Sequence, residues 1–176
     1  MKVALILGTA RQGRQSEKVA LWVRKQAEQF GFDIDYIDVA DHLRRFTNEE
    51  IPGQEGLQAR IVSAEAFIIV SPEYNAGYPG ELKMFLDAFY SEYFGKPVAF
   101  VGVSDGPRGG ARAVEKLRSS ALAMQMTPIR NVLHFGNMPE PFDEGGEVKD
   151  VSQKEKARGL FEQLQAFSQA LSGLRE

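Results

Sequence analysis

The chain has 176 residues, a net charge of −3 at pH 7 and no cysteine. At about 150 residues per domain, this length predicts a single domain over residues 1–176 that buries its core without a disulfide or a metal. The mild acidity argues against binding to nucleic acid or to an anionic membrane. Without thiols, redox chemistry requires a bound cofactor. No apolar run is long enough for a membrane span or a signal peptide, so we expect a cytoplasmic protein.

Five short apolar runs alternate with stretches of helical periodicity, which is typical of a parallel sheet covered by helices on both faces. The runs at 3–7, 66–70 and 98–103 are almost continuously apolar, as strands buried on both faces are. The runs at 32–36 and 128–135 include polar residues, and we expect them at the edges. These assignments predict an α/β fold with a five-stranded, doubly wound sheet in the order 2-1-3-4-5, which is flavodoxin-like.

Apolar stripes with a 3.6-residue period predict the helices. The first stripe ends at a glycine stop: Val19, Val23, Ala27, Phe30, Gly31. A second helix is expected to begin with Pro79 and to carry the stripe Leu82, Phe85, Leu86, Phe89, Tyr93. The last helix carries the stripe Ala157, Leu160, Phe161, Leu164, Phe167, Leu171. The polar stretches 41–56 and 140–150 are predicted to be surface loops or interface arms.

Three loops follow the predicted central strands, at the edge where open α/β sheets bind ligands. The first, residues 8–16, combines glycines, hydroxyls and an arginine before a helix, as a phosphate site requires. Thr9 and Ser16 supply hydroxyl donors, and Arg11 supplies positive charge. The alternative is an ordinary turn in which Ser16 caps the helix.

Glycine spacing in the first loop also invites comparison with a nucleoside-triphosphate loop. Gly8 and Gly13 have the required spacing, but Arg14 and Gln15 stand where Lys and Ser or Thr are needed. The amine that reaches the phosphates and the hydroxyl that holds Mg²⁺ are therefore both missing. We do not expect ATP or GTP chemistry.

The second loop, residues 71–80, is rich in proline, tyrosine and amide side chains. Tyr74 offers a flat apolar face and Asn75 offers a donor and an acceptor, a combination suited to a flat heterocycle. Glu73 is expected to brace the loop as a hydrogen-bond acceptor. The third loop, residues 104–112, has glycines that let backbone approach a ligand. An aromatic lid over the core and a plain glycine-rich connection remain the simpler alternatives for these two loops.

Together the three loops resemble the NAD(P)H-dependent FMN reductases, a flavodoxin-like family that includes chromate, quinone and azo-dye reductases. Residues 8–11 resemble the family's Gly-Ser/Thr-x-Arg-x-x-Ser motif, with its serine displaced to Ser16. The most specific match has the residues Pro72, Glu73, Tyr74, Asn75, Pro79, Gly80, Leu82, Lys83, Asp87. A third match begins with Ser104 and Gly106 and continues through residues 109–112. Met84 departs from the asparagine common in the family, which leaves the details of assembly open.

The resemblance implies FMN, with its phosphate on the first loop and its ring between the other two. The cofactor-binding residues it implies are Thr9, Arg11, Gln15, Ser16, Pro72, Glu73, Tyr74, Asn75, Ser104, Gly106, Gly109. NADPH or NADH is the expected hydride donor, and a quinone, free flavin, azo compound or metal ion is the expected acceptor. Because the flavin carries the chemistry, we expect no catalytic side chain and no metal site. Arg14, Arg108 and Arg112 are candidates for the 2′-phosphate of NADPH, although solvated surface charges are the simpler interpretation.

Two other functions share these features: a flavodoxin-type electron carrier and a binding protein that has lost its flavin. Arg11 and the mild net charge weigh against the carrier, which would have a hydroxyl-rich phosphate loop and a strongly acidic face. Tyr78, Tyr90, Tyr93 and Phe94 present more aromatic surface than one helix can bury. We therefore expect a homodimer or homotetramer.

Overall fold

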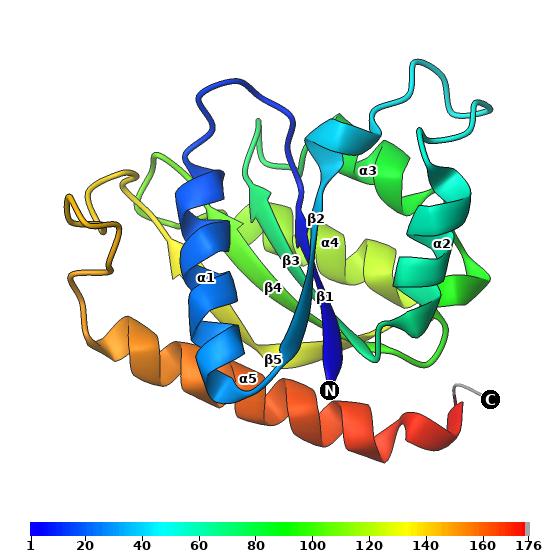
Figure 1. Ribbon diagram of the computed structural model, residues 1–176. Coiled ribbons are helices and arrows are strands. Elements are labelled where there is room, and N and C mark those ends of the chain that lie inside the picture. Colours follow the sequence, from blue (N-terminus) through cyan, green and yellow to red (C-terminus); the bar gives the residue numbers. More distant parts are fainter. Residues whose placement is uncertain (175–176) are drawn as a thin grey trace.

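Five parallel strands form the centre of the computed structural model, which describes residues 1–174 (Figure 1). Their order is β2-β1-β3-β4-β5, which confirms the predicted topology and both predicted edge strands. The strands are β1 Lys2–Leu7, β2 Asp33–Asp38, β3 Ala66–Pro72, β4 Pro97–Val103 and β5 Thr127–Phe135. β1, β3 and β4 are almost completely buried because helices cover both faces of the sheet.

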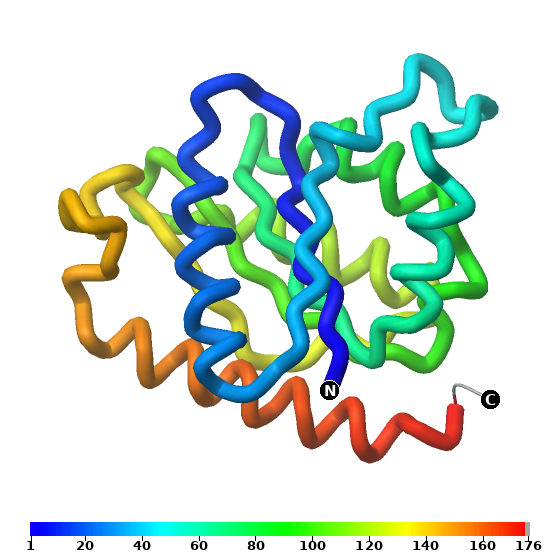
Figure 2. Tube along the Cα trace, viewed as in Figure 1, coloured from blue at the N-terminus to red at the C-terminus, as the bar shows by residue number. Residues whose placement is uncertain are grey.

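The helices divide between the two faces of the sheet, as Figures 1 and 2 show. One face packs against α1 Ser16–Phe30 and α5 Ser152–Ala170. The other packs against α2 Gln54–Ser63, α3 Gly80–Leu86 and α4 Ala111–Ala123. Short 3₁₀ helices occupy Val39–His42, Ser91–Tyr93 and Ser172–Leu174. In Figure 2 the blue loop after β1 and the green loop after β3 lie at the same edge of the sheet.

The first helix follows its sequence signal closely. Val19, Val23 and Ala27 are fully buried against the sheet. The helix ends at Gly31, whose φ of 103° is left-handed and whose N–H donates to the carbonyl of Glu28 at 3.0 Å. The predicted stop is confirmed, because glycine adopts this backbone conformation without steric cost.

The helix after Pro79 is shorter than its apolar stripe predicts. It begins at Gly80, with Pro79 as its N-cap, and ends at Leu86. Phe89 and Tyr93 lie beyond its end in tighter turns, yet both are buried. Their rings pack in a chain of aromatic contacts, with Phe85 6.0 Å from Phe89 and Phe67 5.4 Å from Tyr93 between ring centroids. The periodicity therefore predicted burial correctly and helix length wrongly.

Two polar segments are more ordered than the sequence predicts. The stretch 41–56 ends inside α2, which was not predicted because it buries only Leu57 and Ile61. The stretch 140–150 is not simply a surface loop: Phe142 and Val148 form a bridge and are buried against α1 and α5. In each segment, burial of a few apolar side chains packs the backbone against the core.

None of the helices within residues 1–174 is both long enough and apolar enough to cross a bilayer.

Gly110 and Gly56 form a matched pair for testing this packing. Gly110 has a φ of +76°, and a Cβ there would lie 2.5 Å from the backbone nitrogen of Val103. Gly56 is exposed in α2 with nothing within 4 Å of the corresponding position. We expect Gly110→Ala to lower the free energy of unfolding by about 1–3 kcal/mol. Gly56→Ala should raise it by about 0.5–1 kcal/mol.

Urea denaturation of both variants checks these opposite signs. A Gly110→Ala protein as stable as the original would contradict the close backbone approach between β4 and α4.

Candidate functional site

A cavity of about 430 Å³ lies at the carboxyl ends of the central strands. It is lined by the first loop, by the ends of β3 and β4, and by two residues after β5. The predicted site residues that it brings together are Arg11, Gln15, Ser16, Pro72, Glu73, Tyr74, Ser104. The convergence follows from the parallel sheet, in which the carboxyl ends of neighbouring strands meet at one edge.

Four predicted residues do not line this cavity. Thr9 is 0% exposed beneath it, and Asn75 is exposed at the tip of a turn closed by mutual backbone hydrogen bonds between Tyr74 and Gly77. Asn75 has a φ of 48°, a conformation that asparagine tolerates better than most residues. Gly106 is exposed, and Gly109 is buried against β5.

The first loop has the features of an anion site. Arg11 is exposed on it, with its guanidinium 5.9 Å from the centroid of the Tyr74 ring. Among the described residues, the amides of Gln12 and Gly13 donate to no protein acceptor. The loop leads into α1, whose first turn has no side-chain cap. Unsatisfied backbone amides and the positive end of a helix favour a phosphate.

Gln15 and Ser16 complete this end of the cavity. The Oε1 atom of Gln15 is buried without a hydrogen-bond partner in the described part of the chain. An amide oxygen accepts hydrogen bonds, so the partner that Oε1 lacks is a donor, which the sugar hydroxyls of a ligand could supply but a phosphate dianion could not. The prediction that Ser16 caps the helix is wrong, because Gln15 is the N-cap residue and Ser16 is the first residue of the helix. The donors that fit the phosphate of FMN at this end of the cavity are exposed Arg11, the free amides of Gln12 and Gly13, and the uncapped start of α1.

Arg14 is held inside the protein. Its guanidinium donates to both carboxylate oxygens of Asp38, at the end of β2, and to the carbonyl of Thr9. The two paired side chains are only 12% and 14% exposed, so the prediction of a solvated surface charge is wrong for Arg14. Arg14 also lines the cavity, but most of its guanidinium is committed to Asp38 and to the Thr9 carbonyl.

Burial and the charge of Asp38 together change the pKa values of Arg14 and Tyr36. Burial by itself lowers the pKa of Arg14, but the hydrogen bond and charge of Asp38 outweigh it, and the pKa rises above its ordinary value. Burial, followed by the charge of Asp38, raises the pKa of the Tyr36 phenol to about 12. The first loop is thus fixed by the Arg14–Asp38 pair, beside a tyrosine whose raised pKa keeps it neutral across the ordinary pH range.

Glu73 braces the second loop against α4, as its sequence context predicts. Its carboxylate is 7% exposed and accepts from the backbone nitrogen of Arg112 at 3.1 Å and from the Arg112 Nε at 2.6 Å. The contact places a negative charge at the N-terminal end of α4, where the helix dipole stabilises it. Arg112 is therefore paired. Arg108 is exposed and has no carboxylate partner among residues 1–174.

The glycines of the third loop serve packing. The Gly106 carbonyl accepts from the Asn137 nitrogen at 3.2 Å, and the Gly109 carbonyl accepts from the His134 Nδ1 at 2.9 Å. A Cβ on Gly109 would lie 2.8 Å from the backbone nitrogen of Phe135. The third loop is thereby fastened to the segment that follows β5. The amide of Asp105, which lines the cavity, has no acceptor in the described chain.

Sequence reasoning missed one wall of the cavity. Met138 and Pro139 line it, and the Met138 nitrogen donates to the Ser104 carbonyl at 3.3 Å. No motif marks these residues. Their position after the fifth strand was the available signal, because that strand ends at the same edge of the sheet. Gln12, Val103 and Asp105 also line the cavity and were not singled out.

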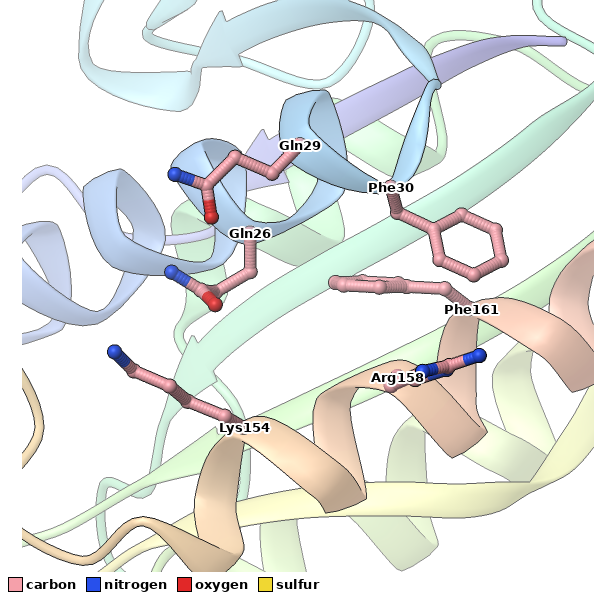
Figure 3. A pocket seen from close by; sticks show the side chains of 6 residues that line it. All are labelled: Gln26, Gln29, Phe30, Lys154, Arg158 and Phe161. Carbon is pink, nitrogen blue, oxygen red and sulfur yellow. The ribbon is translucent and has the colours of Figure 1, made fainter.

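A second hollow, of about 460 Å³, lies between the C-terminal part of α1 and the beginning of α5 (Figure 3). Phe30 and Phe161 form its apolar wall. Its two cations already have partners: Lys154 lies 3.5 Å from Glu147, and Arg158 lies 2.9 Å from Glu162. It is at the far end of α1 from the first loop and adds nothing to the site. No cluster of acidic, histidine or cysteine side chains suited to a metal ion occurs within residues 1–174.

Comparison with known proteins links this geometry to one family. The family model for NADPH-dependent FMN reductase matches residues 1–140. An NAD(P)H-dependent FMN reductase of Schizosaccharomyces pombe is 30% identical, over 93% of this chain and 90% of its own. A probable NADPH:quinone oxidoreductase of Oryza sativa is 27% identical, over 98% and 91%. FerB, a flavoenzyme NAD(P)H:(acceptor) oxidoreductase from Paracoccus denitrificans, has a TM-score of 0.77 at 24% identity over 98% of both chains, a likeness of fold.

Proposed function

This chain belongs to the NADPH-dependent FMN reductase family, and we propose that it transfers a hydride from NADPH or NADH, through flavin N5, to a small-molecule acceptor. The family, the oxidoreductase class and the FMN cofactor predicted from the three loop motifs are confirmed. The acceptor classes that we propose are quinones, free flavin, azo compounds and metal ions. The observation that carries the proposal is the cavity, where Arg11 meets the uncapped start of α1.

The first loop is the proposed phosphate site. Arg11 supplies the charge, and the amides of Gln12 and Gly13 supply backbone donors. Gln15 and Ser16 supply polar side chains at the start of α1. An arginine–phosphate contact is about twice as strong as a neutral hydrogen bond, so Arg11 is expected to dominate the affinity of this end.

The ends of β3 and β4 form the proposed ring site. Pro72 and Tyr74 present rigid and flat apolar surface, and Ser104, just after the end of neighbouring β4, also lines the cavity. Glu73 holds this wall to α4 and does not act as a base. Asn75, Gly106 and Gly109, which are outside the cavity lining, are proposed to contact the ring edge or to shape the loops that contact it. Thr9 is proposed to act from beneath the first loop.

When bound, FMN accepts a hydride from the nicotinamide and passes reducing equivalents on. The protein's own residues contribute placement and access. Val103, Met138 and Pro72 supply the apolar part of a lining that is otherwise mostly polar. The free amide of Asp105 offers a preorganised dipole to charge that develops on reduction. No side chain is assigned as a general acid or base.

The electron-carrier alternative is not favoured. The family and the relatives above are reductases by name, whereas a carrier needs no arginine in its phosphate loop. A scaffold that has lost its flavin has no use for a cavity edged by unpaired donors. We further propose that residues 1–176 act as one FMN-binding domain in the cytoplasm, without nucleic-acid or membrane partners.

The proposal predicts a yellow protein that oxidises NADPH or NADH without a partner reductase. We expect the purified protein to show flavin absorbance, or to take up added FMN. It should then oxidise NADPH or NADH steadily in the presence of a quinone, a ferric chelate or an azo dye. The measurements are the absorbance spectrum of the purified protein and the loss of absorbance by reduced nicotinamide at roughly 340 nm. Colour without oxidation would support the carrier, and absence of both would support the scaffold.

Arg11 provides a sharper test of where the phosphate binds. We expect Arg11→Ala to raise the Kd for FMN by about 10- to 100-fold, the value of a charged hydrogen bond, and to leave the Kd for riboflavin within about twofold. Fluorescence titration measures both constants. Arg130→Ala is the matched control, because Arg130 is exposed on β5 and does not line the cavity. Equal weakening of both flavins by Arg11→Ala would place the phosphate elsewhere.

The aromatic surface after β3 is smaller than predicted but still supports an oligomer. Tyr93 is 0% exposed, so its assignment to a surface is wrong. Tyr90 is 57% exposed and meets Phe94 at 5.0 Å between centroids. We propose a homodimer or homotetramer. Light scattering at micromolar concentration tests this: the expected mass is at least twice the 19.6 kDa of one chain, and a monomer would contradict it.

A further inference from the structure

We infer that Glu81 is the residue that positions the phosphate loop for FMN, acting through the buried hydroxyl of Thr9. The inference rests on the proposed function, in which the first loop holds the FMN phosphate. Glu81 lies in the first turn of α3, outside the lining of the cavity. Its Oε1 accepts from the Thr9 hydroxyl at 3.1 Å and from the Ala10 nitrogen at 3.1 Å.

The hydrogen bonds of Thr9 are fully used by the protein. Its single hydroxyl proton goes to Glu81, because an ionised carboxylate can only accept. The Tyr74 hydroxyl, 2.9 Å away, must therefore donate to Thr9, and the Arg11 nitrogen donates to the same oxygen at 3.3 Å. One donated and two accepted bonds exhaust a hydroxyl. Thr9 has no capacity left for a phosphate.

These contacts join the two loops that the cofactor would span. Glu81 fixes the direction of the Ala10 amide, Thr9 fixes that of Arg11, and the same hydroxyl receives Tyr74 from the second loop. Buried hydrogen-bonded networks of this kind specify one loop conformation and remove the cost of ordering it on binding. Glu81 and Thr9 are thus positioning residues, whereas Arg11 is a binding residue.

The sign of the effect separates this role from simple electrostatics. A carboxylate close to a phosphate repels it, so removing the charge of Glu81 should strengthen FMN binding if repulsion dominates. If Glu81 orders the loop, replacing it with an apolar residue should weaken FMN binding instead. Riboflavin shares the ring and ribityl chain with FMN but lacks the phosphate, so its affinity reports on everything except the phosphate loop.

We expect Glu81→Leu to raise the Kd for FMN by about tenfold, as loss of two hydrogen bonds predicts, with the Kd for riboflavin within about twofold of the original. Glu81→Gln keeps an acceptor oxygen and should bind FMN within about threefold of the original chain. Thr9→Val, at nearly constant volume, should weaken FMN binding at least as much as Glu81→Leu. It should also weaken riboflavin binding to a smaller degree, because it removes the acceptor of the Tyr74 hydroxyl in the proposed ring site. Thr9→Ser should restore the binding of both flavins. Fluorescence titration of flavin-free protein measures each constant, and thermal unfolding checks that each variant folds.

Glu17→Leu is the matched control. Its carboxylate is in the first turn of α1, is half-exposed and reaches only Arg14, at 3.7 Å, so its removal changes local charge without touching Thr9 or Ala10. FMN affinity should stay the same or improve. Tighter FMN binding by Glu81→Leu, or equal weakening of FMN and riboflavin by Glu81→Leu and Thr9→Val, overturns the inference. If the original chain itself binds FMN no better than riboflavin, the proposed phosphate site fails before any variant is considered.

Discussion

Pairing of β1 with β3 is the constraint on which the site depends. The two strands are neighbours in the sheet but not in the chain, so Leu7 lies beside Val70, and the Gly8 nitrogen donates to the Val70 carbonyl at 2.8 Å. The chain leaves the sheet toward α1 after one strand and toward α3 after the other, and the loops part at that point. Gly8 allows close packing there, because a Cβ would lie 2.6 Å from Cδ2 of Leu82 in α3 and would require that side chain to move. This close approach also brings the start of α3 under the first loop, within reach of Thr9.

Charge in the site is arranged by giving most cations a carboxylate partner. Arg14 is paired with Asp38 and Arg112 with Glu73, and these pairs fix the first loop and the second. Arg14 is largely buried, and a buried charge is tolerable only when it is paired and hydrogen-bonded, so Arg14 is committed to structure. Arg112 is exposed, and its pair with the buried carboxylate of Glu73 braces the second loop. Arg11 remains on the cavity side, against the Tyr74 ring, with its charge free for a ligand. The result is a cavity whose donors are oriented before an anion arrives.

Core packing explains why the segment after β5, which carries no sequence motif, forms one wall of the cavity. The rings of Phe135 and Phe142 stack at 5.7 Å between centroids, and Trp22 of α1 meets Phe135 edge-on at 5.6 Å. These contacts hold the chain after β5 against the α1 side of the sheet and carry Met138 to the cavity. The same segment anchors the third loop through Gly106 and Gly109. The wall is therefore positioned by the core, and a change in the core near Phe142 would move it.

The sequence by itself determined the sheet order, the C-terminal end of α1 and the family. Burial of a strand on both faces leaves an unbroken apolar run, and a left-handed helix stop requires glycine, so both are visible as local patterns. It also identified half of the residues that line the cavity, including Arg11, Gln15 and Tyr74, because strand ends of a parallel sheet must converge. Only the tertiary structure decided which polar groups are left for a ligand. Thr9, Arg14 and Arg112 look as available as Arg11 in the sequence, but their partners Glu81, Asp38 and Glu73 are 72, 24 and 39 residues away. Such pairs form only when folding brings distant segments together, and no local pattern records them.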